Sequence, residues 1–182
     1  PMYETQMAKE WEYISRDCGA KVLLAANTTV FGQTSDFPER IEALEHVVLL
    51  SGSASGDVKT YADLLKTGRE NPVEAQQPES QSPMGMIYTS GTTGKPKGVI
   101  LSHRNLIFEC SVVLPLLGMT KDDRSLAFLP WAHVFGQVSE VHGLISSGGS
   151  AGLVDDVNTL IEELGIAKPS MFFAVSRVYN RI

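Results

Sequence analysis

Four serine and threonine side chains, two lysines and three glycines gather within the eleven residues from Tyr88 to Gly98. Glycines lower the steric cost of positive φ and let backbone N–H groups converge on one point. Hydroxyls add hydrogen-bonding groups and lysines add positive charge, and this combination is the chemistry that holds a polyphosphate. The candidate phosphate-binding residues are Thr89, Ser90, Gly91, Thr92, Thr93, Gly94, Lys95 and Lys97.

A loop of this composition has two other possible interpretations. A cluster of Gly, Ser, Thr and Pro often forms only a solvated turn, but the density of hydroxyls and the two lysines favour the phosphate site. A P-loop requires the pattern G-x-x-x-x-G-K-[ST]. Here Gly91 and Gly94 are only three positions apart, and Pro96 follows Lys95 where Ser or Thr should stand. The sequence therefore predicts a phosphate loop of a different kind.

The elements that must position this loop alternate between short apolar runs and amphipathic stretches. Buried strands are expected at residues 21–26, 47–50, 84–88, 99–101, 125–129, 151–154 and 171–175. Helices are expected from Thr5 to Cys18, after Asp36, from Thr60 to Gly68, from His103 to Leu117 with Ser102 as the cap, from Val134 to Gly148, and from Asp155 or Asp156 to Gly165. This alternation predicts an α/β fold of layered, mostly parallel sheets flanked by helices.

The expected inward faces follow from helical spacing. Residues Tyr61, Leu64 and Leu65 should face inward in the helix after Thr60, and Val134, Val138, Val141 and Ile145 in the helix after His133. In sheets of this type, ligands bind at the carboxyl ends of the strands. The pairs Thr89–Ser90 and Trp131–His133 both follow expected strands, so we expect the two polar clusters to face one crevice.

The composition excludes several classes of function. The chain has 182 residues, a net charge of −6, 43% apolar and 20% charged residues, as in a globular protein. It has no run of like charge that would indicate a nucleic-acid partner and no apolar stretch of membrane-spanning length. Cys18 and Cys110 have neither disulfide-framework nor metal spacing, which favours two core thiols in a reducing, cytoplasmic compartment.

The organisation along the chain is expected in three parts. Residues 69–83 are rich in Pro, Gln and Glu and read as a surface connector. They separate an α/β segment at 1–68 from an α/β segment at 84–182 that carries the phosphate loop. The chain opens on Pro1 and its last helical pattern has no capping residue, so it is expected to be a piece of a longer protein whose C-terminal part is absent.

The string from Tyr88 to Gly98, followed by Val99 and Ser102-His103, resembles the phosphate-binding signature of the adenylate-forming superfamily. The string Phe128 to Gly136 is similar to that superfamily's next signature, in the form typical of long-chain fatty-acid–CoA ligases. The resemblance covers nearly the whole chain, and it identifies the N-terminal domain of such an enzyme.

The resemblance implies a two-step reaction. A carboxylate attacks the α-phosphate of Mg-ATP to give an acyl-adenylate and pyrophosphate, and coenzyme A then displaces AMP. It also implies that Thr89 contributes to Mg²⁺ binding and that the residues from Ser90 to Lys95 cradle the β- and γ-phosphates. Lys95 is the candidate catalytic lysine of the loop, and Lys97 serves either the ligand or the loop itself.

A lone histidine in an apolar segment, such as His133, is more often structural than catalytic. The resemblance implies that it orients the carboxylate substrate, without general-base chemistry because a carboxylate needs no deprotonation. Trp131 and Phe135 are candidates to line the acyl path, with core packing as the alternative.

The family's adenine-binding segment, ribose-binding aspartate and C-terminal catalytic lysine have no match here, so our hypothesis is that the chain is inactive alone. The leading interpretation is activation of a long-chain fatty acid. The alternatives are adenylation of an aryl or amino acid, and a nucleotide-binding module without catalysis. Peripheral membrane contact by the parent enzyme and its oligomeric state are left open.

Overall fold

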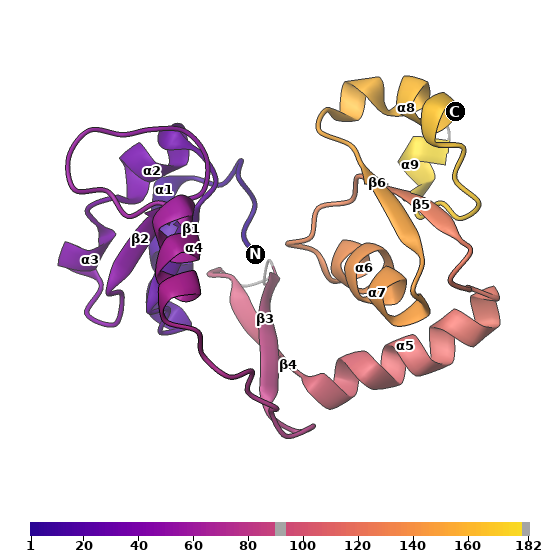
Figure 1. Ribbon diagram of the computed structural model, residues 1–182, viewed down its shortest axis with the longest axis horizontal. Helices are drawn as coiled ribbons and strands as arrows, with labels where there is room; N and C mark the ends of the chain where they lie inside the picture. Colours follow the sequence, from indigo (N-terminus) through magenta and orange to yellow (C-terminus); the bar gives the residue numbers. More distant parts are fainter. Residues whose placement is uncertain (90–93, 180–182) are drawn as a thin grey trace. The chain divides into compact units, whose positions relative to one another are not determined.

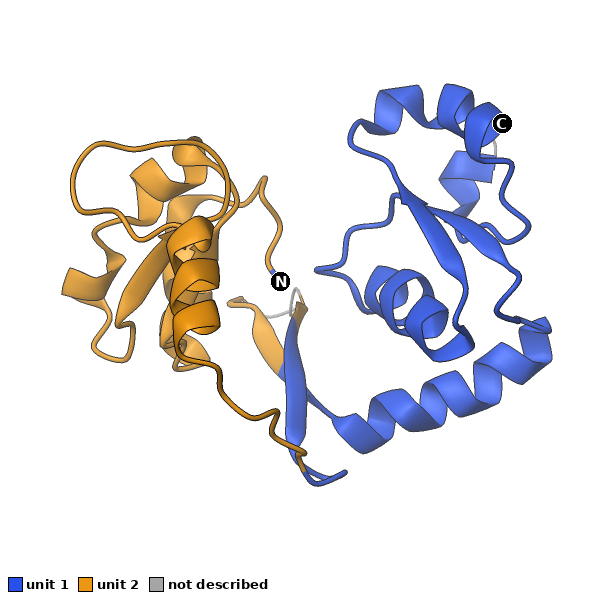
Figure 2. Ribbon diagram, viewed as in Figure 1, with its two compact units in different colours: residues 1, 79–87, 99–182 blue, residues 2–78, 88–98 orange. Residues whose placement is uncertain are grey.

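The computed structural model describes residues 1–89 and 94–179. The chain divides into two compact units (Figure 2), and each is described by itself. Unit 2 comprises residues 2–78 and 88–98, and unit 1 comprises residue 1 together with 79–87 and 99–182. Helices flank short strands, many of them paired in parallel, and this confirms the predicted α/β class. The predicted division at residues 69–83 stays a prediction.

Unit 2 is built around a pair of parallel strands, β1 (Val22–Ala25) and β2 (His46–Leu49), with Val22 opposite His46 (Figure 1). Its helices are α1 (Ala8–Asp17), α2 (Thr28–Thr34), α3 (Phe37–Arg40) and α4 (Tyr61–Glu70). The buried core gathers one side of α1, both strands and the chain around α3. Its members are Trp11, Leu23, Ala25, Phe37, Ile41, Leu44 and Val47.

Helix α1 begins two residues later than predicted. The N-cap is Met7, whose N–H donates to the carboxylate of Glu10 at 2.9 Å, so the predicted Thr5 cap is wrong. A carboxylate in the first turn satisfies a backbone donor and complements the helix dipole, and it replaces a hydroxyl cap. The predicted end is confirmed, because Gly19 follows the helix with φ of +63°, a conformation that favours glycine.

Strand β1 is buried on one face only, which corrects the prediction of a fully buried run. Leu23 and Ala25 lie in the core, whereas Val22 and Leu24 are about half exposed. Alternation of this kind is the period-2 pattern of a strand that is covered on one side. Sequence could not distinguish the two cases, because both faces carry apolar residues.

Helix α4 shows that a correct start does not guarantee a correct face. Thr60 and Asp63 form the capping box, with the Asp63 N–H donating to Thr60 Oγ1 at 3.3 Å, and this confirms the predicted cap. The inward prediction is wrong, since Tyr61, Leu64 and Leu65 are all exposed. Their apolar spacing marks a face that is only partly covered. Helix α2, capped by Asn27, was not predicted.

Unit 1 contains the parallel pair β5 (Arg124–Ala127) and β6 (Ser150–Leu153), with Arg124 opposite Ser150. The long helix α5 (His103–Leu117) precedes them and is bounded as predicted. Ser102 caps it, accepting from the Asn105 N–H at 3.2 Å, and Gly118 ends it with φ of +65°. Pro115 lies inside the last turn without ending the helix.

The strands that flank the phosphate loop, β3 (Pro83–Thr89) and β4 (Lys97–Ser102), form a two-stranded sheet. They were predicted to be buried, but only Ile87 is. This pair carries the chain from unit 1 into unit 2 and back, because residues 88–98 are grouped with unit 2.

The helix after His133 is not one regular helix. It runs as α6 (Val134–Gly136), the π-helix η1 (Gln137–His142) and α7 (Gly143–Ser147), and Gly148 ends it as predicted. A π-turn inserts an extra residue into the helical register. Glu140 and Leu144 are therefore buried. Val134 and Ile145 were both predicted to face inward, but both are exposed, Ile145 to 74%.

The last part of unit 1 differs from prediction in two places. Asp156 caps the 3₁₀ turn η2 (Val157–Thr159), and α8 (Leu160–Ala167) runs past Gly165 to end at Lys168. The predicted strand 171–175 is reduced to a single parallel bridge between Met171 and Ser125, followed by α9 (Ser176–Tyr179). Aromatic packing holds this segment instead, with the ring of Phe172 stacked on Phe128 at 5.5 Å between centroids.

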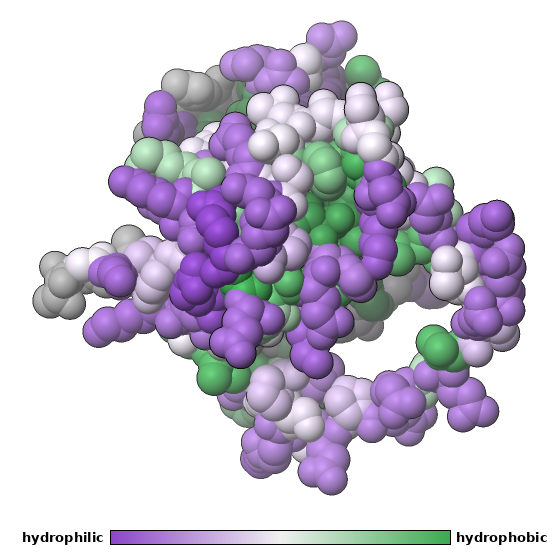
Figure 3. All heavy atoms as spheres, turned by 90° about the vertical axis from the view of Figure 1, so that its left-hand side faces the viewer, coloured by the Kyte–Doolittle hydropathy of each residue, from purple (hydrophilic) through white to green (hydrophobic). Residues whose placement is uncertain are grey.

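No helix among residues 1–89 and 94–179 is long and apolar enough to cross a membrane. Figure 3 shows a face on which hydrophilic side chains dominate, with hydrophobic ones mostly set back in a recess between them.

Replacement of Phe37 by Ala is expected to destabilise the chain by about 3–5 kcal/mol, because it removes a fully buried ring and leaves a cavity. Urea unfolding followed by circular dichroism measures the change. The matched control is Val73→Ala, at a position that is 92% exposed, where the expected change is within about 0.5 kcal/mol. Equal stability of the two variants would contradict the core assignment.

Candidate active site

The two ends of the predicted phosphate loop are the end of β3 and the start of β4. Thr89 is the last residue of β3, Lys97 is the first of β4, and both are exposed. Gly94 has φ of +135°, which residues with a Cβ rarely adopt. Ser90, Gly91, Thr92 and Thr93 lie outside the described residues. The described part thus presents one hydroxyl and the cations of Lys95 and Lys97 at the mouth of the loop.

Helix α1 holds both ends of this loop. The hydroxyl of Tyr13 donates to the carbonyl oxygen of Pro96 at 3.0 Å, and the hydroxyl of Tyr88 donates to Asp17 Oδ2 at 2.6 Å. Tyr13 and Asp17 are four residues apart and lie on the same side of the helix. Burial, with a further contribution from the hydrogen bond to Asp17, raises the pKa of Tyr88, so its hydroxyl stays a donor. One helical turn therefore fixes the entry and the exit of the loop.

Lys95 lies over an aromatic ring of the same helix. Its Nζ is 5.3 Å from the centroid of the Tyr13 ring, which is within the range of a cation–π interaction. Tyr13 therefore contacts the loop twice, through its hydroxyl and through its ring face. The same side chain thus holds the ammonium group of Lys95 and the backbone of Pro96, the next residue.

His133 lies directly before α6 and caps it. Its ring Nδ1 accepts from the Phe135 N–H at 3.2 Å, and its backbone N–H donates to the carbonyl oxygen of Pro130 at 3.0 Å. Because Nδ1 accepts a hydrogen bond, the neutral ring carries its proton on Nε2. The exposed ring can therefore offer an N–H donor to an anion, which suits the predicted role of orienting a substrate. That role stays a prediction.

The carboxylate of Glu140 accepts hydrogen bonds from the segment that leads to His133. Its Oε1 accepts from the N–H groups of Phe128 and Leu129, each at 3.1 Å. Its Oε2 accepts from the Leu129 N–H at 3.1 Å and from Trp131 Nε1 at 3.2 Å. Glu140 is only 3% exposed. Burial raises the pKa of its carboxyl above the ordinary value, and the N–H donors of Leu129, Phe128 and Trp131 oppose that rise.

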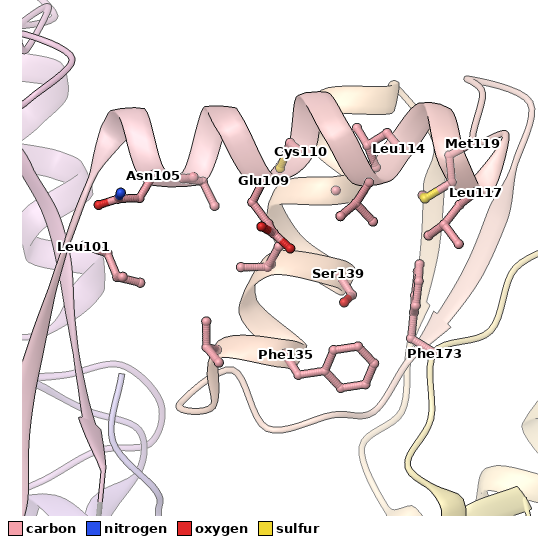
Figure 4. A pocket seen from close by; sticks show the side chains of 15 residues that line it. Leu101, Asn105, Glu109, Cys110, Leu114, Leu117, Met119, Phe135, Ser139 and Phe173 are labelled. Atoms are coloured by element: carbon pink, nitrogen blue, oxygen red, sulfur yellow. The ribbon is translucent and has the colours of Figure 1, made fainter.

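An apolar pocket of about 620 Å³ lies between α5 and the α6–η1 segment of unit 1 (Figure 4). Its polar side chains are those of Asn105, Glu109 and Ser139, and Glu109 and Ser139 point into it. The apolar lining consists of Leu101, Leu106, Cys110, Val113, Leu114, Leu117, Met119, Val134, Phe135, Val138 and Phe173, together with Gly143. Phe173 packs edge-on against Phe135, with 6.4 Å between ring centroids. Of the two aromatic candidates for an acyl path, Phe135 lines this pocket and Trp131 does not.

The site residues are thus distributed over both units. Thr89, Gly94, Lys95 and Lys97 belong to unit 2, whereas His133 belongs to unit 1. The predicted common crevice stays a prediction. Among the described residues there is no cluster of acidic, histidine and cysteine side chains that could hold a metal ion by itself.

The sequence did not indicate three residues that hold the candidate site in place, Tyr13, Asp17 and Glu140. Tyr13 and Asp17 give no local signal, because their partners are 83 and 71 residues away. Glu140 gives none either, because α-helical spacing places it well to the side of the face formed by Val134, Val138, Val141 and Ile145, and it is buried only with the π-turn.

The raised pKa of Glu140 predicts a pH dependence of stability. As the pH rises from the ordinary glutamate pKa toward the raised one, the unfolded chain loses the proton that the folded chain still holds. The free energy of unfolding therefore falls across that window. Glu140→Gln removes this part of the slope, and Glu162→Gln, at an exposed carboxylate of α8, keeps it. Urea unfolding from about pH 4 to about pH 8 measures the slope; equal slopes in wild type and Glu140→Gln contradict the assignment.

Comparison with known proteins places the chain. The profile of the AMP-binding enzyme family matches residues 1–182. Long-chain-fatty-acid–CoA ligase FadD15 of Mycobacterium bovis is 30% identical over 187 residues, covering 100% of this chain and 31% of the relative. Long chain acyl-CoA synthetase 5 of Arabidopsis thaliana is 35% identical over 151 residues, covering 80% of this chain and 22% of the relative. The chain spans less than a third of the length of these two relatives.

Solved structures show the same fold. The anthranilate CoA ligase AuaEII, in complex with anthranoyl-AMP, superposes with a TM-score of 0.84 at 24% identity, covering 95% of this chain and 34% of that one. ATP-bound MatB from Rhodopseudomonas palustris superposes with a TM-score of 0.77 at 22% identity, covering 100% and 35%. The family profile accounts for the whole length of the sequence, and the chain therefore belongs to the AMP-binding enzyme family.

Proposed function

We propose that this chain supplies the ATP-phosphate loop and part of the acyl site of a long-chain fatty-acid–CoA ligase. The enzyme would join a fatty acid to the α-phosphate of ATP, release pyrophosphate, and transfer the acyl group to coenzyme A. The observation that carries the choice of substrate is the apolar pocket lined by Val134 and Phe135, the two residues that follow His133.

The pocket supports a fatty acid by its size and its chemistry. Its volume of about 620 Å³ is in the range of small-molecule sites, roughly 300–1,000 Å³. Its lining is mainly aliphatic and aromatic, from α5 on one side and from Val134 to Gly143 on the other, so that a long hydrocarbon chain would leave water on entering it.

The loop supports the nucleotide half of the reaction. Charge builds on the departing pyrophosphate, and cations and donors that are held in place before the reaction stabilise it. Tyr13 and Asp17 provide that fixation, and Lys95 provides a cation. Thr89 offers a hydroxyl oxygen, the kind of ligand that suits Mg²⁺ when the ion is held mainly by phosphates. Bound Mg²⁺ would neutralise part of the phosphate charge.

His133 supports the carboxylate end of the acyl site. With Nδ1 occupied by the Phe135 N–H, the ring can donate from Nε2 to a carboxylate oxygen. This fixes where the acid group points and leaves the proton on the ring. The apolar pocket begins at the next two residues, which suits a substrate with a polar head and an apolar tail.

Lys95→Ala and Thr89→Ala are each expected to slow fatty-acid-dependent ATP–pyrophosphate exchange by roughly 100-fold, because each removes one preorganised group from the phosphate site. The assay uses the full-length protein that carries this chain. Lys66→Ala, which removes an exposed lysine of α4, should retain the wild-type rate. Wild-type rates in both loop variants would refute the phosphate role, and exchange with amino acids but not fatty acids would refute the choice of substrate.

Val113→Phe is expected to shift the preference toward shorter acids, because the added ring fills the pocket. The expected fall in kcat/KM for a long acid, relative to a short one, is at least about 10-fold. The neighbouring Val112 is exposed and does not line the pocket, so Val112→Phe is the matched control and should leave the preference unchanged. The same preference in both variants would mean that the acyl chain binds elsewhere.

A further inference from the structure

We propose that Glu140 is a positioning residue for the carboxylate substrate. It holds the Trp131 indole and the backbone of Phe128 and Leu129, and it thereby fixes the conformation of the segment that leads to His133. The inference rests on the proposed function for its kinetic consequence, but its structural part stands on contacts within unit 1.

The carboxylate of Glu140 accepts hydrogen bonds from several donors at once. Three N–H groups, from Phe128, Leu129 and Trp131, converge on the two oxygens of Glu140 at distances of 3.1 to 3.2 Å. All three belong to the four residues that follow β5. The carboxylate therefore specifies the path of the chain where it leaves the sheet.

An apolar side chain could not replace Glu140. The side chain is only 3% exposed, in a buried place where an apolar residue is the usual occupant. Such a residue would leave the N–H groups of Phe128 and Leu129 without an acceptor in a buried place. An unsatisfied buried donor has lost its hydrogen bonds to water without replacement, and this destabilises the fold. A buried carboxylate is itself costly, and here the donors offset that cost while fixing one conformation.

The segment that Glu140 holds also contacts His133. The backbone N–H of His133 donates to the carbonyl oxygen of Pro130, which lies between Leu129 and Trp131 in the sequence. A Cβ added at Gly136 would meet that same carbonyl oxygen at 2.7 Å, so α6 begins in close contact with the segment. Movement of Leu129 and Trp131 would therefore be transmitted to the ring of His133.

The test separates the indole contact from the backbone contacts. Glu140→Gln keeps an acceptor for Phe128 and Leu129 but turns an amide N–H₂ toward the Trp131 donor. Trp131→Phe removes the indole N–H and keeps an aromatic ring. Both variants, their double variant, and Glu162→Gln as the control are compared in fatty-acid-dependent ATP–pyrophosphate exchange by the full-length protein.

Each single variant is expected to lower kcat/KM for the fatty acid by roughly 10- to 100-fold, as small misplacements near a reacting group do. The KM for ATP should not change. The double variant should be no worse than the more severe single variant, because the two substitutions break the same contact. Losses that multiply in the double variant, or an unchanged kcat/KM in both single variants, would overturn the inference.

A second readout does not depend on activity. In ¹⁵N spectra of the 182-residue chain, Glu140→Gln should shift the Trp131 indole signal and the ring signals of His133. The indole of Trp11, which donates to the Tyr3 carbonyl oxygen in unit 2, should be unmoved. Unchanged Trp131 and His133 signals would overturn the inference. If wild type shows no exchange with any carboxylate, the proposed function fails, and these spectra still decide the role of Glu140. If Glu140→Gln does not fold, the His133 signals of Trp131→Phe decide it.

Discussion

Where the chain leaves a strand inside the protein, its buried backbone N–H groups must find new acceptors. The structure of unit 1 depends on how this requirement is met. The strand β5 ends at Ala127, and the next two N–H groups donate to the side chain of Glu140. The π-turn within η1 is what places that side chain on the buried face, since the same turn leaves Ile145 in solvent. The irregular helix therefore buries the carboxylate, and the carboxylate in turn fixes the path of the chain to His133.

Unit 2 meets a different requirement, that of holding a glycine-rich loop in place. Glycines let the backbone approach a phosphate but raise the entropy that must be lost on ordering. Two tyrosine hydroxyls limit that loss by tying the flanks of the loop to α1. Neither bond takes up a group that the loop would offer to a phosphate, because the Pro96 carbonyl and the Tyr88 side chain lie at its margins. Both flanks of the loop are therefore held by α1.

The sequence predicts those features whose causes are local. Helix α5 is bounded correctly at both ends because Ser102 and Gly118 act within one turn of it. The segment 171–175 was expected to be a strand from its apolar run, yet its rings pack on Phe128 and Phe135 and only Met171 pairs. Glu140, Tyr13 and Asp17 act on distant residues, so spacing along the chain could not reveal their partners. The phosphate role of the loop residues is a prediction from their types alone, whereas the contacts that hold Tyr88 and Pro96 required the structure.

The division of β3 and β4 between the units has a consequence for the order of folding. Unit 2 begins at Met2 but is completed by residues 88–98, which follow a stretch that belongs to unit 1. On a ribosome, α1 emerges long before its tyrosine and carbonyl partners, which lie 71 and 83 residues further on. The entropy of closing such loops grows only slowly with length, by about 0.6 kcal/mol for each doubling. The contacts between α1 and the flanks of the loop therefore cost little extra entropy, but they form late. The loop acquires its fixed ends only after much of unit 2 has already been synthesised.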